Sequence, residues 1–149
     1  MTLRIIIAWI HLLTLCVGFY AIWSRARAFK KLKDTAGLPD VFQADNYWGI
    51  AAIMWMATGY WRAFGGFEKG TDYYLHSTAF WIKMSLFILV FFVELKPMIT
   101  LVKWRRRYKK GETFDISQGR LFALLSRVEL GLLVLIVLFA TAVARGAWY

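Results

Sequence analysis

Six ionisable side chains stand within long apolar stretches of this sequence, where their types and spacing could support chemistry. They are His11, His76, Lys83, Glu94, Arg127 and Glu129. Such groups are costly inside a membrane, so they are usually paired or functional. A neutral imidazole can bind iron, a cationic side chain can hold an anion, and opposite charges can form ion pairs. The sequence therefore offers a candidate metal ligand, candidate anion-binding groups and candidate structural ion pairs.

Three of these residues share one apolar run. His76, Lys83 and Glu94 are separated by 7 and 11 residues, which places them on one face of a helix with 3.6 residues per turn. We expect this polar face to point into a helix bundle. The rise per residue places His11 and Lys83 within about 3 Å of the membrane midplane, on two parallel helices. We therefore predict that His11 and Lys83 line one intramembrane site, with His76 and Arg62 at a level nearer the outer surface.

Structural roles are the alternative for these residues. Arg127 with Glu94 or Glu129 is the expected structural ion pair. His76 is close enough to the membrane boundary to cap a helix or form a hydrogen bond there. His11 could bond a group on a neighbouring helix, which is a common role for polar residues in membrane bundles. The sequence leaves both interpretations of the histidines open.

The elements that must position these residues are membrane-spanning helices. The chain has 149 residues, of which 60% are hydrophobic and 18% aromatic, and a soluble domain this small cannot bury so much apolar surface. Apolar runs cover about residues 3–23, 47–63, 73–95 and 121–144, and each is long enough to cross a bilayer as a helix. We therefore predict an all-α integral membrane four-helix bundle, formed as a single domain by residues 1–149.

Basic residues indicate the orientation of this bundle. The net charge is +10, and 13 of the 19 Lys and Arg residues lie in two segments between apolar runs, at 25–33 and 96–120. Four crossings put both segments on one side, opposite Arg4, Arg62, Lys69 and Arg145. The positive-inside rule then places the basic loops in the cytoplasm and both termini outside. Clusters of this kind favour contact with anionic lipids of the inner leaflet, and we expect no nucleic-acid partner.

The connections between the runs add local expectations. Asp45 is expected to cap the N-terminus of the second helix, and Pro97 is expected to kink the third helix as it leaves the membrane. Residues 98–110 then look like an amphipathic cytoplasmic extension that continues along the inner headgroups.

Several motifs resemble those of a known family. They are DNYWG at 45–49, TGYWRAFGGFEKGTDYYLH at 58–76, FWIKM at 80–84 and WRR at 104–106. Together they resemble a bacterial family of predicted membrane proteins without an assigned activity. The resemblance spans most of the chain and implies a multi-pass protein of the bacterial inner (cytoplasmic) membrane.

A more distant resemblance suggests a cofactor. A histidine early in the first span and a lysine within the third are similar to the HemJ-type protoporphyrinogen oxidases, with His11 and Lys83 at these positions. Glu129 corresponds loosely to an Asn-Glu pair in the fourth helix, with Val128 in place of the Asn. The resemblance implies a b-type haem inside the bundle, held by His11 as the iron ligand.

The depths of the side chains restrict how such a haem could bind. Arg62 or Lys83 could neutralise its propionates. His11 and His76 differ by about 9 Å in depth, which makes opposed ligation by both awkward. A five-coordinate haem on His11, or Met54 or Met56 as a sixth ligand, fits the depths better.

Two classes of function follow from these observations. The first is a redox protein or enzyme that holds non-covalent haem b. The second is a protein without a cofactor, either a homo-oligomer or an accessory subunit that packs its aromatic surface against a larger membrane complex. A transporter ranks third because the sequence has no internal repeat. The sequence assigns no catalytic residue and no substrate.

Overall fold

Helices make up almost all of the computed structural model, which describes residues 2–66 and 69–147. The four long helices are α1 (Thr2–Lys31), α2 (Leu38–Phe64), α4 (Thr78–Lys109) and α5 (Gly119–Arg145). A 3-10 turn, η1 (Thr35–Gly37), precedes α2, and a short helix, α3 (Thr71–His76), precedes α4. No strand occurs in the described part of the chain, so the predicted all-α class is confirmed.

The apolar character of the helices agrees with a membrane protein. Within the described residues, α1, α4 and α5 are long and apolar enough to cross a membrane. α2 has the same length as α5, 27 residues, but Trp, Tyr and Gly residues and Arg62 lower the mean hydropathy of its second half. The structure thus supports three membrane-crossing helices on length and composition, and the fourth predicted crossing stays a prediction.

Both α1 and α2 extend beyond the predicted spans at the connection between them. α2 begins at Leu38, followed by Pro39, whose fixed φ suits the first turn of a helix. The side chain of Asp34 accepts a hydrogen bond from the backbone N–H of Ala36 and organises the preceding turn. Asp45 therefore lies inside α2, and the expectation that it caps this helix is wrong.

The third predicted span is divided at Ser77. This residue has an extended backbone, and its hydroxyl accepts a hydrogen bond from the backbone N–H of Phe80, as an N-cap does. His76 therefore belongs to the short helix α3 and Lys83 to α4. The expectation that His76, Lys83 and Glu94 share one continuous helical face is wrong, because the chain changes direction between the first two.

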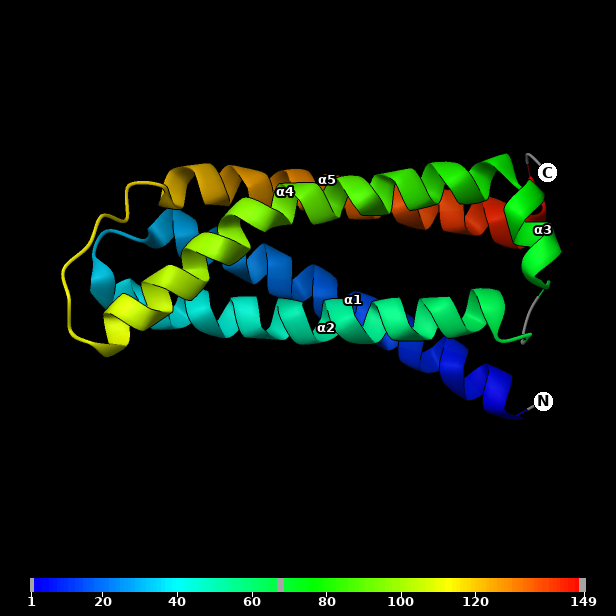
Figure 1. The fold of residues 1–149 in the computed structure, drawn as a ribbon, viewed down its shortest axis with the longest axis horizontal. Coiled ribbons are helices and arrows are strands. Elements are labelled where there is room, and N and C mark those ends of the chain that lie inside the picture. The colour runs from blue at the N-terminus through cyan, green and yellow to red at the C-terminus, as the bar shows by residue number, and fades with distance from the viewer. Residues whose placement is uncertain (1, 67–68, 148–149) are drawn as a thin grey trace.

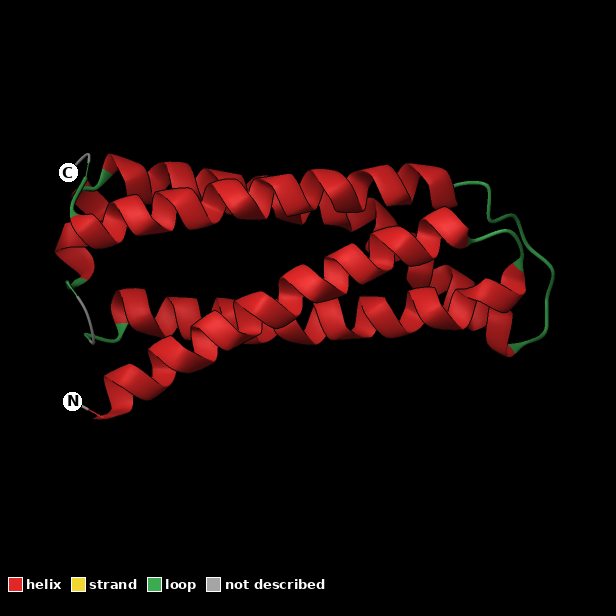
Figure 2. Cartoon of the chain, turned by 180° about the vertical axis from the view of Figure 1, so that it is seen from behind, coloured by secondary structure: helices red, strands yellow, loops and turns green. Residues whose placement is uncertain are grey.

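The long helices form a bundle with two different ends. α1 crosses the bundle diagonally and packs against both α2 and α5, while α4 packs along α5 (Figure 1). Residues 32–37 and 110–118 connect the helices at one end, which we call the loop end. α1 begins and α5 ends at the opposite end, together with α3, and we call this the termini end (Figure 2).

The loop end has a close-packed core formed by all four long helices. Phe29, Leu38, Leu101, Trp104 and Phe122 are almost completely buried in it. α4 continues without interruption through Pro97 and changes direction between its two halves (Figure 1). The predicted extension at 98–110 is therefore the end of α4, and Leu101 and Trp104 pack it into the core of the bundle, while its position along the headgroups stays a prediction.

Candidate functional site

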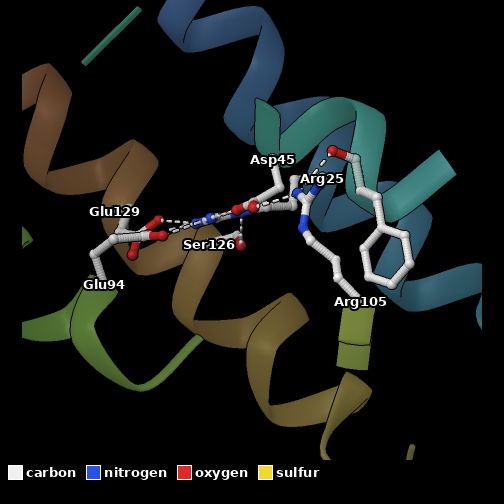
Figure 3. Close-up of polar contacts among 7 residues, drawn as sticks. Arg25, Asp45, Glu94, Arg105, Ser126 and Glu129 are labelled. Carbon is white, nitrogen blue, oxygen red and sulfur yellow. Dashed lines mark hydrogen bonds and ion pairs between the residues drawn. The ribbon is translucent and has the colours of Figure 1, made fainter. Parts of the chain in front are cut away.

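A buried arginine joins all four long helices near the loop end. Arg25 on α1 is fully buried, and its guanidinium group contacts one carboxylate from each of the other three (Figure 3). Glu94 of α4 accepts two hydrogen bonds of 2.7 Å, in a bidentate pair. Glu129 of α5 accepts one at 2.7 Å, and Asp45 of α2 accepts one at 2.9 Å. Such charge-assisted bonds fix the positions of the four helices relative to one another.

Arg105 extends this cluster toward the loops. Its Nη2 donates to the second carboxylate oxygen of Asp45 at 2.8 Å and to the backbone oxygen of Phe42 at 3.0 Å (Figure 3). Its guanidinium group also lies over the Phe42 ring, 4.8 Å from the centroid. Ser126 completes the arrangement by accepting a bond of 3.3 Å from Nε of Arg25. We call Arg25, Asp45, Glu94, Arg105, Ser126 and Glu129 the Arg25 cluster.

The charges in the Arg25 cluster do not balance when every group is ionised. Two guanidinium groups face three carboxylates, which leaves one negative charge. Glu129 is fully buried, and its Oε1 has no hydrogen-bond partner among the described residues. Glu94 and Glu129 also share Nη2 of Arg25, so their carboxyl groups lie close together. One bound proton would make the cluster neutral.

The sequence predicts the acids of the buried ion pairs correctly, but the predicted base, Arg127, is wrong. Glu94 and Glu129 do form buried ion pairs, but their partner is Arg25, and Arg127 is exposed. From the sequence, Arg25 is predicted to lie in the basic segment 25–33, outside the membrane-spanning run. The buried positions Gly18 and Ala21 precede it at spacings of seven and four residues, so helical periodicity would have placed Arg25 on the inward face.

A second polar site lies between the helices at the termini end. An open cavity of about 330 Å³ is lined by residues of α2, α3, α4 and α5, with His11 of α1 in its wall. Arg62 and Lys83 contribute to the lining, together with aromatic and aliphatic side chains such as Phe80, Phe87 and Ile136. His11 and Lys83 thus line the same cavity, and Arg62, which the sequence places at a separate level with His76, lines it as well. Their roles in binding stay a prediction.

The two cations and two of the aromatic rings, Trp55 and Phe87, lie at different depths in this cavity. Arg62 lies two residues from the end of α2 and Lys83 five residues into α4, about 3 Å and 8 Å along their helices. Trp55 and Phe87 each lie nine residues from the same helix ends, about 14 Å along. Arg62 and Lys83 are therefore nearer the termini end of the cavity than Trp55 and Phe87 are.

His11 is held in the cavity wall through both ring nitrogens. Trp55 donates its indole N–H to Nε2 at 2.9 Å, and Nδ1 lies 2.8 Å from the hydroxyl oxygen of Thr58. The Thr58 hydroxyl itself donates to the backbone oxygen of Met54, so Nδ1–H must be the donor to Thr58. This pattern assigns a neutral imidazole whose proton is on Nδ1. Gly59 allows the close approach, because a Cβ there would lie 3.2 Å from Cε1 of His11.

These contacts do not fit His11 as an iron ligand. A ligating imidazole presents a free lone pair to the metal, whereas the lone pair on Nε2 accepts the Trp55 N–H and Nδ1 carries the proton. His76 does not offer a replacement at this cavity. It is exposed on α3, and its Nδ1 lies 2.9 Å from the backbone oxygen of Asp72. In this cavity, therefore, neither histidine presents a free ring nitrogen to the iron of a haem.

Comparison with protein families assigns the chain to a known group. Residues 3–147 match the model of the family described as "Predicted membrane protein (DUF2214)". The chain belongs to this family. Comparison with curated proteins and with solved structures gives no match. These findings confirm the resemblance to a family of predicted membrane proteins, and they lend no support to the resemblance to HemJ-type oxidases.

Proposed function

We propose that this DUF2214 protein binds a small amphipathic anion in the cavity at the termini end. The observation that carries the proposal is the combination of two cations, Arg62 and Lys83, with aromatic and aliphatic walls in one cavity inside the bundle. Ligand sites in proteins are mostly apolar with a few placed polar groups. The acidic group of the ligand would lie near the two cations, and its apolar part would extend toward Trp55 and Phe87.

The size of the cavity limits the ligand class. At about 330 Å³ it lies at the lower end of the range found for small-molecule pockets, roughly 300–1,000 Å³. A linear lipophilic acid suits this volume and the apolar walls. The Lys83 ammonium group lies 4.8 Å from the centroid of the Phe80 ring, which keeps the charge at the wall of the cavity and next to the ligand.

The proposed topology places this cavity in the outer half of the membrane. Four crossings, with α2 as the fourth, put both termini outside and the loop end in the cytoplasm, as the distribution of Lys and Arg favours. In a Cys16→Ser background, cysteines at Lys69 and Lys109 test it with an impermeant thiol reagent. We expect labelling from outside at position 69 only, and labelling at 109 only would overturn the topology.

Binding can be tested with a photoreactive probe. A diazirine derivative of palmitic acid should label peptides of α2 and α4 in the purified protein, and the matched hexadecanol derivative should label them more weakly. Lys83→Met and Arg62→Gln should each reduce labelling by the acid about fivefold, the factor that corresponds to a contact of roughly 1 kcal/mol, and leave labelling by the alcohol unchanged. Lys103→Met at the loop end is the matched control.

Two results would contradict the proposal. Equal labelling by acid and alcohol in the wild type would show that Arg62 and Lys83 do not favour a negatively charged ligand over a neutral one. A Soret band in the visible spectrum that disappears in His11→Ala would show instead that the cavity rearranges to hold haem through this histidine.

A further inference from the structure

A second basic site lies on the outside of the bundle at the loop end. α1 and α5 form a groove there whose lining includes Arg27, Lys30, Lys31 and Lys33 from α1 and the residues after it, and Arg127 from α5. The volume of this groove is about 800 Å³, and Trp23, Ala26 and Leu130 complete it. Five cations and no acidic residue line it, so it can accept more than one negative charge.

These cations are available for a ligand, unlike their neighbour Arg25. Among residues 2–66 and 69–147, no carboxylate lies within ion-pair distance of the five groove cations, whereas Arg25 binds three. Arg127 is exposed in the groove, because it is two residues from the buried Glu129 on α5 and therefore about 200° away around the helix. The Arg27 guanidinium group lies over the Trp23 ring, 4.5 Å from the centroid, which orients its charge toward the groove.

The position of the groove along the bundle matches the inner headgroup layer. Trp23 and Leu130 form its apolar side, and Lys30, Lys31 and Lys33 form the side nearest the loops. Trp23 and Lys31 are eight residues apart on α1, about 12 Å along the helix. Trp is enriched at membrane boundaries, and basic pockets between helices on the cytoplasmic side bind anionic headgroups.

We propose that the groove between α1 and α5 binds the phosphate headgroup of an anionic phospholipid from the inner leaflet. Arg27 and Arg127 would hold one phosphate from two helices, and the lysines after them would contact further headgroup oxygens. The acyl chains would continue past Trp23 and Leu130 along the apolar surface of α1 and α5. This site is separate from the cavity at the termini end and does not depend on ligand binding there. Only its assignment to the inner leaflet rests on the topology proposed above.

Native mass spectrometry of protein released from nanodiscs tests the proposal. Nanodiscs of phosphatidylcholine with a minor fraction of cardiolipin or phosphatidylglycerol supply the lipid. Wild-type protein should retain the anionic lipid in preference to phosphatidylcholine. Arg27→Gln with Arg127→Gln should lower retention roughly 25-fold, since each interfacial cation is worth about a factor of five. Lys103→Gln with Arg106→Gln removes two exposed cations of α4 at the same end and should leave retention within about twofold.

Three outcomes would overturn the inference. An equal loss in the α4 control would show a general effect of net charge without a site. Full retention in the groove variant would show that these residues do not bind lipid. Displacement of the lipid by millimolar inorganic phosphate, with equal affinity for both anions, would assign the groove to a soluble phosphate compound. A thermal melt of each variant ensures that the comparison is made between folded proteins.

Discussion

Cationic side chains have different surroundings at the two ends of the bundle. At the loop end, Arg25 is surrounded by acids from three helices and by a core that includes Phe29 and Trp104. At the termini end, Arg62 and Lys83 line a cavity between helices. The ion pairs of Arg25 fix the arrangement of the four helices, whereas Arg62 and Lys83 lie at the wall of a cavity. The difference shows that the Arg25 cluster ties the helices together at the loop end, and it is the basis of the proposal that the termini end binds a ligand.

The largest effect is expected at the centre of the Arg25 cluster. Arg25→Met would leave three carboxyl groups buried without their common partner, and breaking a buried ion pair costs about 3–5 kcal/mol. We expect the free energy of unfolding in detergent to fall by this amount. Arg127→Met is the matched control, because Arg127 is exposed, and should change it by less than about 0.5 kcal/mol. Equal losses would contradict the structural assignment of Arg25.

The two glutamates of the cluster should differ in their contribution. Glu94→Gln removes the bidentate contact with Arg25 and should cost about 1.5–3 kcal/mol of unfolding free energy. Glu129→Gln keeps one oxygen for Arg25 and removes the surplus negative charge, so the loss should stay below about 1 kcal/mol. Chemical unfolding of the two variants at the same pH measures the difference. A larger loss for Glu129→Gln would show that its charge is required.

The wall of the cavity should be less sensitive than the loop end. His11→Ala removes the contacts with Trp55 and Thr58, and interhelical hydrogen bonds in membranes average about 0.6 kcal/mol each. We therefore expect a loss of about 1 kcal/mol in unfolding free energy. Labelling by the palmitic acid probe should persist in this variant, because the cations remain. Loss of labelling would assign His11 a direct role in binding.

The smallest effect is expected at His76. This side chain is exposed and its ring bonds within α3, so His76→Ala should change the unfolding free energy by less than about 0.5 kcal/mol. Probe labelling should also stay at the wild-type value. A decrease in labelling similar to that of Lys83→Met would show that α3 moves toward the cavity when ligand binds.

The approach of α1 to α2 offers a way to sharpen the comparison. A Cβ at Gly59 would lie 3.2 Å from the His11 ring, and a Cβ at Gly18 would lie 3.3 Å from the Trp48 ring. Gly59→Ala should therefore displace His11 and alter its histidine NMR signals. Gly18→Ala should affect the packing of the two helices and leave those signals in place.

Periodicity and composition predicted the class of the molecule and part of each site. The helices and their membrane character follow from apolar runs and helical spacing, because both depend on residues near one another in the chain. Asp45 was predicted as a cap and Arg25 as a loop charge, since their local surroundings favour those roles. Both assignments were wrong: α2 begins at Leu38, seven residues before Asp45, and α1 continues to Lys31, so that Arg25 is buried among acids from three other helices.

The sequence by itself determined that this chain is helical, apolar and strongly asymmetric in charge, because these properties depend on residue types and their order. Only the tertiary structure decided which base pairs with Glu94 and Glu129, that Arg127 lies in a groove, and that both nitrogens of His11 are already bonded. The contacts of Glu94, Glu129 and His11 join residues 44–104 positions apart in the chain. They depend on how α1 crosses the bundle, which no local pattern specifies.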